Sequence, residues 1–208
     1  GAYLNVVAIE GLMDAVADTT GRDPLDVRRD HLDDPRARAV LDRAAAMAGW
    51  GDPRPEGVGL GVGLARYKNK AGWCAVCAEV AVDEAATVRR LWAAADVGEV
   101  FDPEGVRAQI EGGMLQALSW TLIEEARLGE GLSPPRAWAD YPVLTFADIP
   151  AIDVALIDRP EAPPLGAGEI AQGPAGAAIV GAVARALGVA LTDLPLSRAR
   201  LMQALLDA

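Results

Sequence analysis

The chain has 208 residues, with 30 acidic and 19 basic side chains and a formal net charge of -11 at pH 7. This charge argues against binding to nucleic acid or to an anionic membrane surface, because either would need clustered lysine and arginine. The longest apolar stretch, residues 175–184, is too short to cross a bilayer, so no transmembrane segment is expected. We expect a soluble chain, cytoplasmic or periplasmic, whose length suits one or two domains.

Helical signals dominate the N-terminal part of the chain. Apolar residues at helical spacing predict a helix over residues 7–18, which Gly21 ends. A second helix starts with Asp23 as its N-cap and Pro24 in its first helical position. A third helix is predicted from Arg36 to Gly49, again ended by glycine.

A proline- and glycine-rich joint at 51–57 follows, and beyond it the hydrophobic pattern changes from helical to alternating. The alternation predicts strands at 58–67, 73–82 and 87–94 and an antiparallel meander. The glycines of GVGLGVG, residues 57–63, fit the first of these strands. They lack the G-x-G-x-x-G spacing and the Gly-Lys-Ser/Thr ending of a phosphate-binding loop.

Two long helices that contain glycine are predicted in the second half. The first runs from Glu104 to Arg127 and takes Gly112 and Gly113 into its middle, where each costs about 1 kcal/mol relative to alanine. Either close helix packing or the close approach of a cofactor would explain this pair. The second long helix spans 174–188, with a proline in its first turn and a glycine at its end.

The remaining signals complete an α+β fold. A short strand is predicted at 152–157, an extended loop at 160–173, and a short amphipathic helix at the end of the chain. The fold class is therefore α+β, with N-terminal helices, a small antiparallel sheet and two long glycine-containing helices. We expect the helical segment 1–50 and the α+β segment 57–208 to form one compact unit.

Cysteine and histidine give no indication of a metal site. Cys74 and Cys77 lie in an alternating, β-branched strand, where residues three apart point to opposite faces, so we interpret them as buried structural thiols. Iron-sulfur clusters held by cysteine need about four thiolates. The single histidine, His31, lies at a charged helix end without a second His or Cys at ligand spacing, which favours a capping or surface role.

One carboxylate, Glu169, is placed unusually. It follows Gly166-Ala167-Gly168 and precedes a helix made almost wholly of small residues, and glycines here permit a close approach that a Cβ would prevent. From local sequence alone, Glu169 could simply interact with the helix dipole. The alternative is an acid presented to a bound group.

Two segments resemble the molybdenum hydroxylases, the xanthine dehydrogenase and aldehyde oxidase family. DPEGVRAQIEGGMLQALSWTLIEE (102–125) resembles the family's G-Q-x-E-G-x-x-x-Q-G-L element, and the Gly-Ala-Gly-Glu turn resembles its active-site glutamate turn. The opening 32 residues, the segment CAEVAVDEAATVRRLWAAADVGEVFDPEG and the closing LPLSRARL also resemble the family, so the likeness covers essentially the whole chain. It is nearest in kind to the bacterial isoquinoline oxidoreductase and aldehyde dehydrogenase type large subunits.

The resemblance implies a hydroxylase that oxidises an aldehyde or an N-heterocycle with oxygen from water. It makes Glu169 the catalytic base, in a mostly apolar pocket where burial would raise the pKa of a carboxylate. The implied cofactor is molybdopterin with molybdenum, in bacteria often the cytosine dinucleotide form. The residues implied to bind it are Gln109, Gly112, Gly113, Gln116, Gly166, Ala167 and Gly168.

The resemblance also implies partners. Family large subunits are several times longer, so the chain is expected to be the C-terminal part of the molybdopterin-binding domain, with other cofactor loops and a pocket arginine preceding Gly1. It would share its cofactor with a larger molybdopterin-binding chain, and iron-sulfur clusters would lie on a partner subunit. No residue of this chain is expected to bind metal.

The sequence departs from the family pattern at two places. Ala117 stands where the pattern usually has glycine, and Ile170-Ala171 replaces a proline-containing pair after the glutamate. These departures leave open a non-catalytic assembly or scaffold subunit of such a complex. Outside the family, a generic α+β small-molecule binding module and a hydrolase that uses Glu169 are the alternatives.

Overall fold

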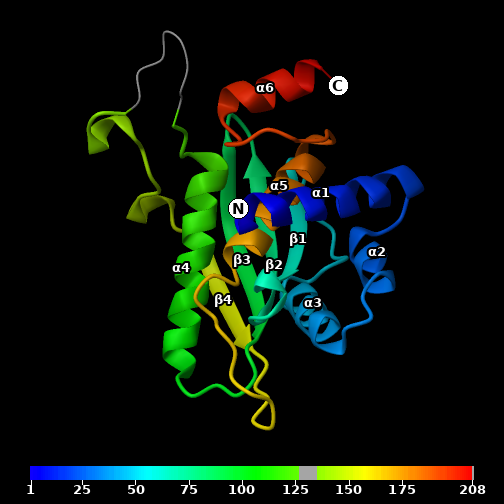
Figure 1. Ribbon diagram of the computed structural model, residues 1–208. Coiled ribbons are helices and arrows are strands. Elements are labelled where there is room, and N and C mark those ends of the chain that lie inside the picture. Colours follow the sequence, from blue (N-terminus) through cyan, green and yellow to red (C-terminus); the bar gives the residue numbers. More distant parts are fainter. Residues whose placement is uncertain (127–134, 208) are drawn as a thin grey trace.

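The computed structural model describes residues 1–126 and 135–207 (Figure 1). The helices are α1 (Ala2–Thr20), α2 (Pro24–Asp30), α3 (Pro35–Met47), α4 (Pro103–Leu122), α5 (Gln172–Leu187) and α6 (Arg198–Leu206). The strands are β1 (Val58–Arg66), β2 (Trp73–Val82), β3 (Ala86–Asp96) and β4 (Ala151–Leu156). The predicted α+β class is confirmed. No helix in this described part is both long and apolar enough to span a membrane.

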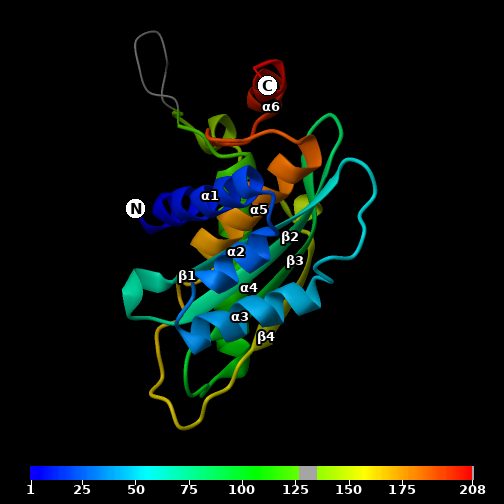
Figure 2. The ribbon, with the colours of Figure 1, turned by 90° about the vertical axis from the view of Figure 1, so that its right-hand side faces the viewer.

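The sheet has the order β1-β2-β3-β4. The first three strands form the predicted antiparallel meander, and β4, whose place in the sheet was not predicted, pairs parallel to β3 and makes the sheet mixed. The chain reaches β4 by a crossover through α4, and such a connection allows parallel pairing. The turn between β1 and β2 projects on the same side of the molecule as the N-terminus (Figure 2).

Helices cover both faces of the sheet. Residues of α4 and α5 form one core cluster with one face of the strands, and residues of α3 form a second cluster with the opposite face. Cys74 belongs to the first cluster and Cys77 to the second, as their spacing on β2 predicts. Both thiols are free and buried.

The backbone of α5 lies directly on β1. Gly59, Gly61 and Gly63 alternate along the strand and present one face without side chains. A Cβ on any of them would overlap the α5 backbone, at the carbonyl oxygens of Ala182, Ala178 and Pro174 respectively. The glycines of GVGLGVG therefore serve close helix-sheet packing.

A second face of α5 is equally close to α1. A Cβ at Gly173 would meet the side chain of Val6, and one at Gly176 would meet the ring of Tyr3. The small residues that make this helix unusual in the sequence thus let it pack tightly against two neighbours. Eleven of its residues, from Gly173 to Val183, are buried.

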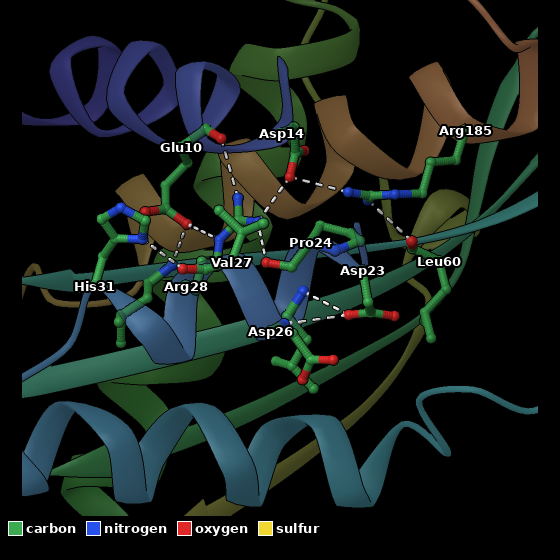
Figure 3. Close-up of polar contacts among 12 residues, drawn as sticks. Glu10, Asp14, Asp23, Pro24, Asp26, Val27, Arg28, His31, Leu60 and Arg185 are labelled. Atoms are coloured by element: carbon green, nitrogen blue, oxygen red, sulfur yellow. Dashed lines mark hydrogen bonds and ion pairs between the residues drawn. The ribbon is translucent and has the colours of Figure 1, made fainter. Parts of the chain in front are cut away.

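A buried ionic cluster joins α1 to α2 (Figure 3). The Arg28 side chain is 2% exposed and donates from Nε to Glu10 Oε2 at 2.8 Å and from Nη1 to Asp14 Oδ1 at 2.7 Å. Its Nη2 donates to the Glu10 carbonyl at 3.0 Å. Burial lowers and the two carboxylates raise the pKa of Arg28, and the net direction is upward.

The same cluster covers the free edge of β1. Glu10 Oε2 accepts the Leu64 backbone N–H at 3.1 Å, and Arg185 of α5 donates to the Leu60 carbonyl at 3.1 Å. Arg185 also donates to Asp14 at 2.9 Å (Figure 3). Backbone groups of an edge strand that would otherwise be unpaired are therefore satisfied by side chains from two helices.

The end of α4 differs from the prediction. The helix ends at Leu122, not at Arg127, which lies outside the described residues. A continuing helix would use the Thr121 carbonyl to accept from residue 125, but that carbonyl instead accepts the Leu196 N–H at 2.7 Å. A contact distant in sequence therefore ends the helix, where the local pattern would have allowed it to continue.

The glycine face of β1 predicts a sharp difference between two substitutions. We expect Gly61→Ala to lower the free energy of unfolding by about 3 kcal/mol, because overpacking of a tight core typically costs about 1–3 kcal/mol. The control is Gly11→Ala in α1, where a Cβ has nothing within 4 Å. It should be neutral or stabilise by up to about 1 kcal/mol. Denaturant unfolding measures both, and equal effects would contradict the packing described.

Candidate functional site

Backbone hydrogen bonds hold the loop that carries Glu169 beside the sheet. The Leu165 N–H donates to the Val97 carbonyl at 2.8 Å, just beyond the end of β3. The Gly72 N–H, at the end of the turn between β1 and β2, donates to the Gly166 carbonyl at 3.1 Å. The predicted extended loop is confirmed, and its anchors place it beside that turn.

Glu169 lies next to Tyr67 in space. Its Oε2 accepts a hydrogen bond from the Tyr67 hydroxyl, which belongs to the short 3₁₀ turn η1 (Tyr67–Asn69) directly after β1. Glu169 is exposed, so the expected apolar enclosure is not supplied by the described residues. Sequence reasoning missed Tyr67 because the two residues are 102 positions apart and no local motif links them.

Helix α4 runs past the same loop and brings two of its predicted residues to it. A Cβ at Gly168 would lie 3.6 Å from Gln109 Oε1. Gln172, the first residue of α5, donates from Nε2 to Gln116 Oε1 at 3.3 Å. The candidate residues of α4 and of the glutamate loop, far apart in sequence, are therefore neighbours.

The two glycines in the middle of α4 have different surroundings. Gly113 is buried, and a Cβ there would lie 3.3 Å from the Ala171 Cβ, so close packing explains its lack of a side chain. Gly112 is exposed, and a Cβ there would have nothing within 4 Å. Of the two explanations offered for the pair, packing thus accounts for Gly113 alone.

Several polar groups at this site have no partner in the described part of the chain. Gln172 Oε1 is buried and accepts no hydrogen bond. The backbone N–H groups of Gly166, Ala167 and Gly168 donate to no acceptor among the described residues. A run of free donors beside an unpaired buried acceptor is suited to binding a polar ligand.

A pocket of about 370 Å³ includes Glu169 in its lining. It opens between the start of α1, the end of α4 and the turn after β1. Its lining includes Tyr3, Tyr67, Lys68, Trp120, Glu169 and Gly173. The carboxylate is therefore shared by two surroundings, the α4 face and this pocket.

The other candidates from the sequence lie away from this site. His31 caps α2, and its Nδ1 lies 2.8 Å from the Val27 carbonyl, in keeping with the predicted capping role. Burial raises the pKa of both Cys74 and Cys77 to about 12. In residues 1–126 and 135–207 no three His, Cys, Asp or Glu side chains gather as a metal site would require.

Comparison with known proteins points to one family. The family model of the molybdopterin cofactor-binding domain matches residues 56–150. The chain is 37% identical to a nicotinate dehydrogenase subunit of Pseudomonas putida, over 98% of this chain and 19% of that one. It is 35% identical to the beta subunit of isoquinoline 1-oxidoreductase from Brevundimonas diminuta, over 91% of this chain and 25% of that one.

The chain belongs to the molybdenum hydroxylase family. It spans about a fifth of the length of the first of these curated relatives and a quarter of the second. Aldehyde oxidoreductase from Desulfovibrio gigas shares the fold over 99% of this chain and 41% of its own, with a TM-score of 0.80 at 15% identity. Quinoline 2-oxidoreductase from Pseudomonas putida 86 matches 65% of this chain and 18% of its own, with a TM-score of 0.58 at 30% identity.

The departures from the molybdenum hydroxylase pattern lie in the interior. Ala117 is fully buried on α4, and Ile170 and Ala171 are each 1% exposed at the start of α5. All three belong to the core cluster between these helices and the sheet. They therefore lie in the packed core behind the site, whereas Glu169 and Gly112 lie at the surface.

Burial predicts the reactivity of the two thiols. Because a thiol with a pKa near 12 is almost wholly protonated at pH 8, neither Cys74 nor Cys77 should react with a thiol reagent in the folded protein. Two thiols per chain should react once the protein is unfolded in denaturant. A spectrophotometric thiol titration measures this, and rapid labelling of either cysteine in the native state would refute the assignment as structural thiols.

Proposed function

We propose that this chain supplies the active-site glutamate and part of the pterin site of a molybdenum-dependent hydroxylase. The enzyme would oxidise an aldehyde or an N-heterocycle with oxygen derived from water. The observation that supports this most directly is the position of Glu169, held by Tyr67 beside a row of unpaired polar groups. Nicotinate and isoquinoline, after which two of the relatives are named, are both N-heterocycles.

The residues fit a large polar cofactor. The unpaired Oε1 of Gln172 and the free N–H groups of 166–168 provide one acceptor and several donors. Gly112 leaves an open surface on α4, and Gln109 and Gln116 flank it. We propose that these groups, together with the closely packed Gly113 of α4, hold molybdopterin as its cytosine dinucleotide. When bound, the molybdenum centre would make the water-derived oxygen nucleophilic and accept the electrons of the oxidation.

Glu169 would act as the general base. The Tyr67 hydroxyl engages Oε2, whereas no described residue donates to Oε1. One carboxylate oxygen is therefore fixed in direction, and the other can take a proton from the attacking oxygen at the reacting carbon. A carboxylate oriented in this way loses less freedom when substrate arrives.

The exposure of the site supports the proposal that other chains cover it. Glu169 and Gly112 both lie at the surface of the described chain, so a closed active site needs further polypeptide over them. We propose that a larger molybdopterin-binding chain supplies this cover and that an iron-sulfur subunit receives the electrons. The nicotinate and isoquinoline relatives are themselves named as subunits, which supports an assembly of more than one chain.

Replacement of the base tests the proposal. Glu169→Gln keeps the volume and can still accept from Tyr67, but it cannot take a proton. We expect hydroxylation by the assembled complex to fall by about 10²- to 10⁴-fold, the usual effect of losing a general base. Molybdenum and pterin content should stay near the wild-type level, as metal analysis and pterin fluorescence would show. Turnover at the wild-type rate would mean that Glu169 is a structural acid.

The open face of α4 gives a second test. Gly112→Leu should leave the fold intact, because Gly112 is exposed and a Cβ there has no neighbour within 4 Å among the described residues. It should reduce the molybdenum and pterin content of the complex several-fold by occupying the space proposed for the cofactor. The matched control is Gly11→Leu on α1, also in open space, which should leave cofactor content unchanged. Full loading of the Gly112→Leu variant would remove α4 from the cofactor site.

A further inference from the structure

Both lysines of this chain, Lys68 and Lys70, lie on the turn between β1 and β2. The chain has 19 basic residues, so the other 17 are arginines spread along its length. Lys68 is held there in the left-handed backbone region, with φ of 49°, which is uncommon for residues other than glycine. The backbone of the turn therefore sets the direction in which the Lys68 side chain leaves it.

This turn borders the candidate site. Tyr67, immediately before Lys68, donates to Glu169, and Lys68 lines the same pocket of about 370 Å³ as Glu169. Lys68 Nζ lies 5.0 Å from the centre of the Tyr67 ring. In Figure 2 the turn, in teal, projects freely at the side of the molecule where α1 begins. Lys68 and Glu169 thus line one pocket, and no ion pair within 4 Å joins them.

The lysines are not neutralised by the protein. Within the described ranges neither Lys68 nor Lys70 has a carboxylate oxygen within 4 Å, although the chain carries a net charge of -11. Many arginines, in contrast, form ion pairs, among them Arg28, Arg36 and Arg54. The turn therefore carries two cations without an ion-pair partner on an acidic molecule.

We propose that the turn carrying Lys68 and Lys70 is a subsite for the carboxylate of an anionic substrate, an N-heterocyclic carboxylic acid. The inference rests on the proposed function, since it assigns a substrate class to the site that holds Glu169. A lysine ammonium is a compact charge on a flexible four-carbon stem. It can therefore hold the carboxylate at the pocket rim while Glu169 works at a ring carbon.

The arrangement favours the substrate over a cofactor phosphate as the source of the anion. Most groups suited to the cofactor, those on α4 and at 166–168, lie outside the pocket that Lys68 lines, which includes only Trp120 from α4. Glu169 and Gln172 belong to both. An anion at the lysines would therefore lie in the pocket and away from most of the proposed pterin groups.

The test compares two probes of the same shape, pyridine-3-carboxylate and the uncharged pyridine-3-carboxamide. In the assembled complex, Lys68→Gln with Lys70→Gln should lower the ratio of kcat/KM for carboxylate over carboxamide by roughly tenfold, as expected for loss of a short-range charge attraction. Lys68→Arg with Lys70→Arg should retain the ratio. Arg43→Gln on α3, an exposed cation with no ion pair in the described structure, is the control for charge removal.

Two further measurements make the outcome decisive. Equilibrium dialysis of each probe measures binding without turnover, and the carboxylate should bind more weakly to the Lys→Gln double variant than to the wild type. Its binding to the wild type should also weaken as salt rises, whereas carboxamide binding should not. An unchanged carboxylate preference in the double variant overturns the proposal. Loss of cofactor from that variant also overturns it, in favour of a phosphate contact.

Failure of the proposed function would look different. In that case neither probe would be hydroxylated in a manner sensitive to Glu169→Gln. The dialysis result would still decide the subsite, because it does not depend on turnover. Hydroxylation of the carboxamide that needs Glu169, combined with equal binding of both probes to wild type and double variant, would keep the function and remove the subsite.

Discussion

The close contact between the α5 backbone and the glycine face of β1 sets the position of everything at the site. No side chain separates the helix from Gly59, Gly61 and Gly63, so α5 has little freedom to slide or tilt. Its first residue is thereby fixed relative to the end of β1. Glu169 lies three residues before the helix and Tyr67 lies one residue after the strand, which is why these two side chains meet.

The buried ionic cluster supports the same arrangement from the other side of α5. Burying Arg28 with Glu10 and Asp14 is costly unless every polar atom is paired, and here the partners include the N–H of Leu64 on the edge of β1. The cluster therefore does more than balance charge. It aligns α1 with the strand whose end carries Tyr67, and α1 in turn packs against the small-residue face of α5.

Much of the fold could be read from the sequence because its signals are local. Asp23 with Pro24, the glycine at 21 and the alternation in β2 each specify an element through neighbouring residues. What the sequence could not provide are contacts between distant segments: the parallel pairing of β4, the Leu196 N–H that ends α4, and the hydrogen bond from Tyr67 to Glu169. The position of Glu169 could be singled out, but its exposure could not.

Residues at the site carry free-energy costs that residues of the core do not. Gly112 costs about 1 kcal/mol relative to alanine, and nothing in the described chain offsets this, in contrast to the packed Gly113. The unpaired Gln172 Oε1 adds the cost of a buried acceptor without a donor, about 1–3 kcal/mol. Together these are a large part of a typical stability of about 5–15 kcal/mol. No described residue of the chain offsets these two costs, and a bound cofactor that hydrogen-bonds Gln172 and lies against Gly112 would account for both.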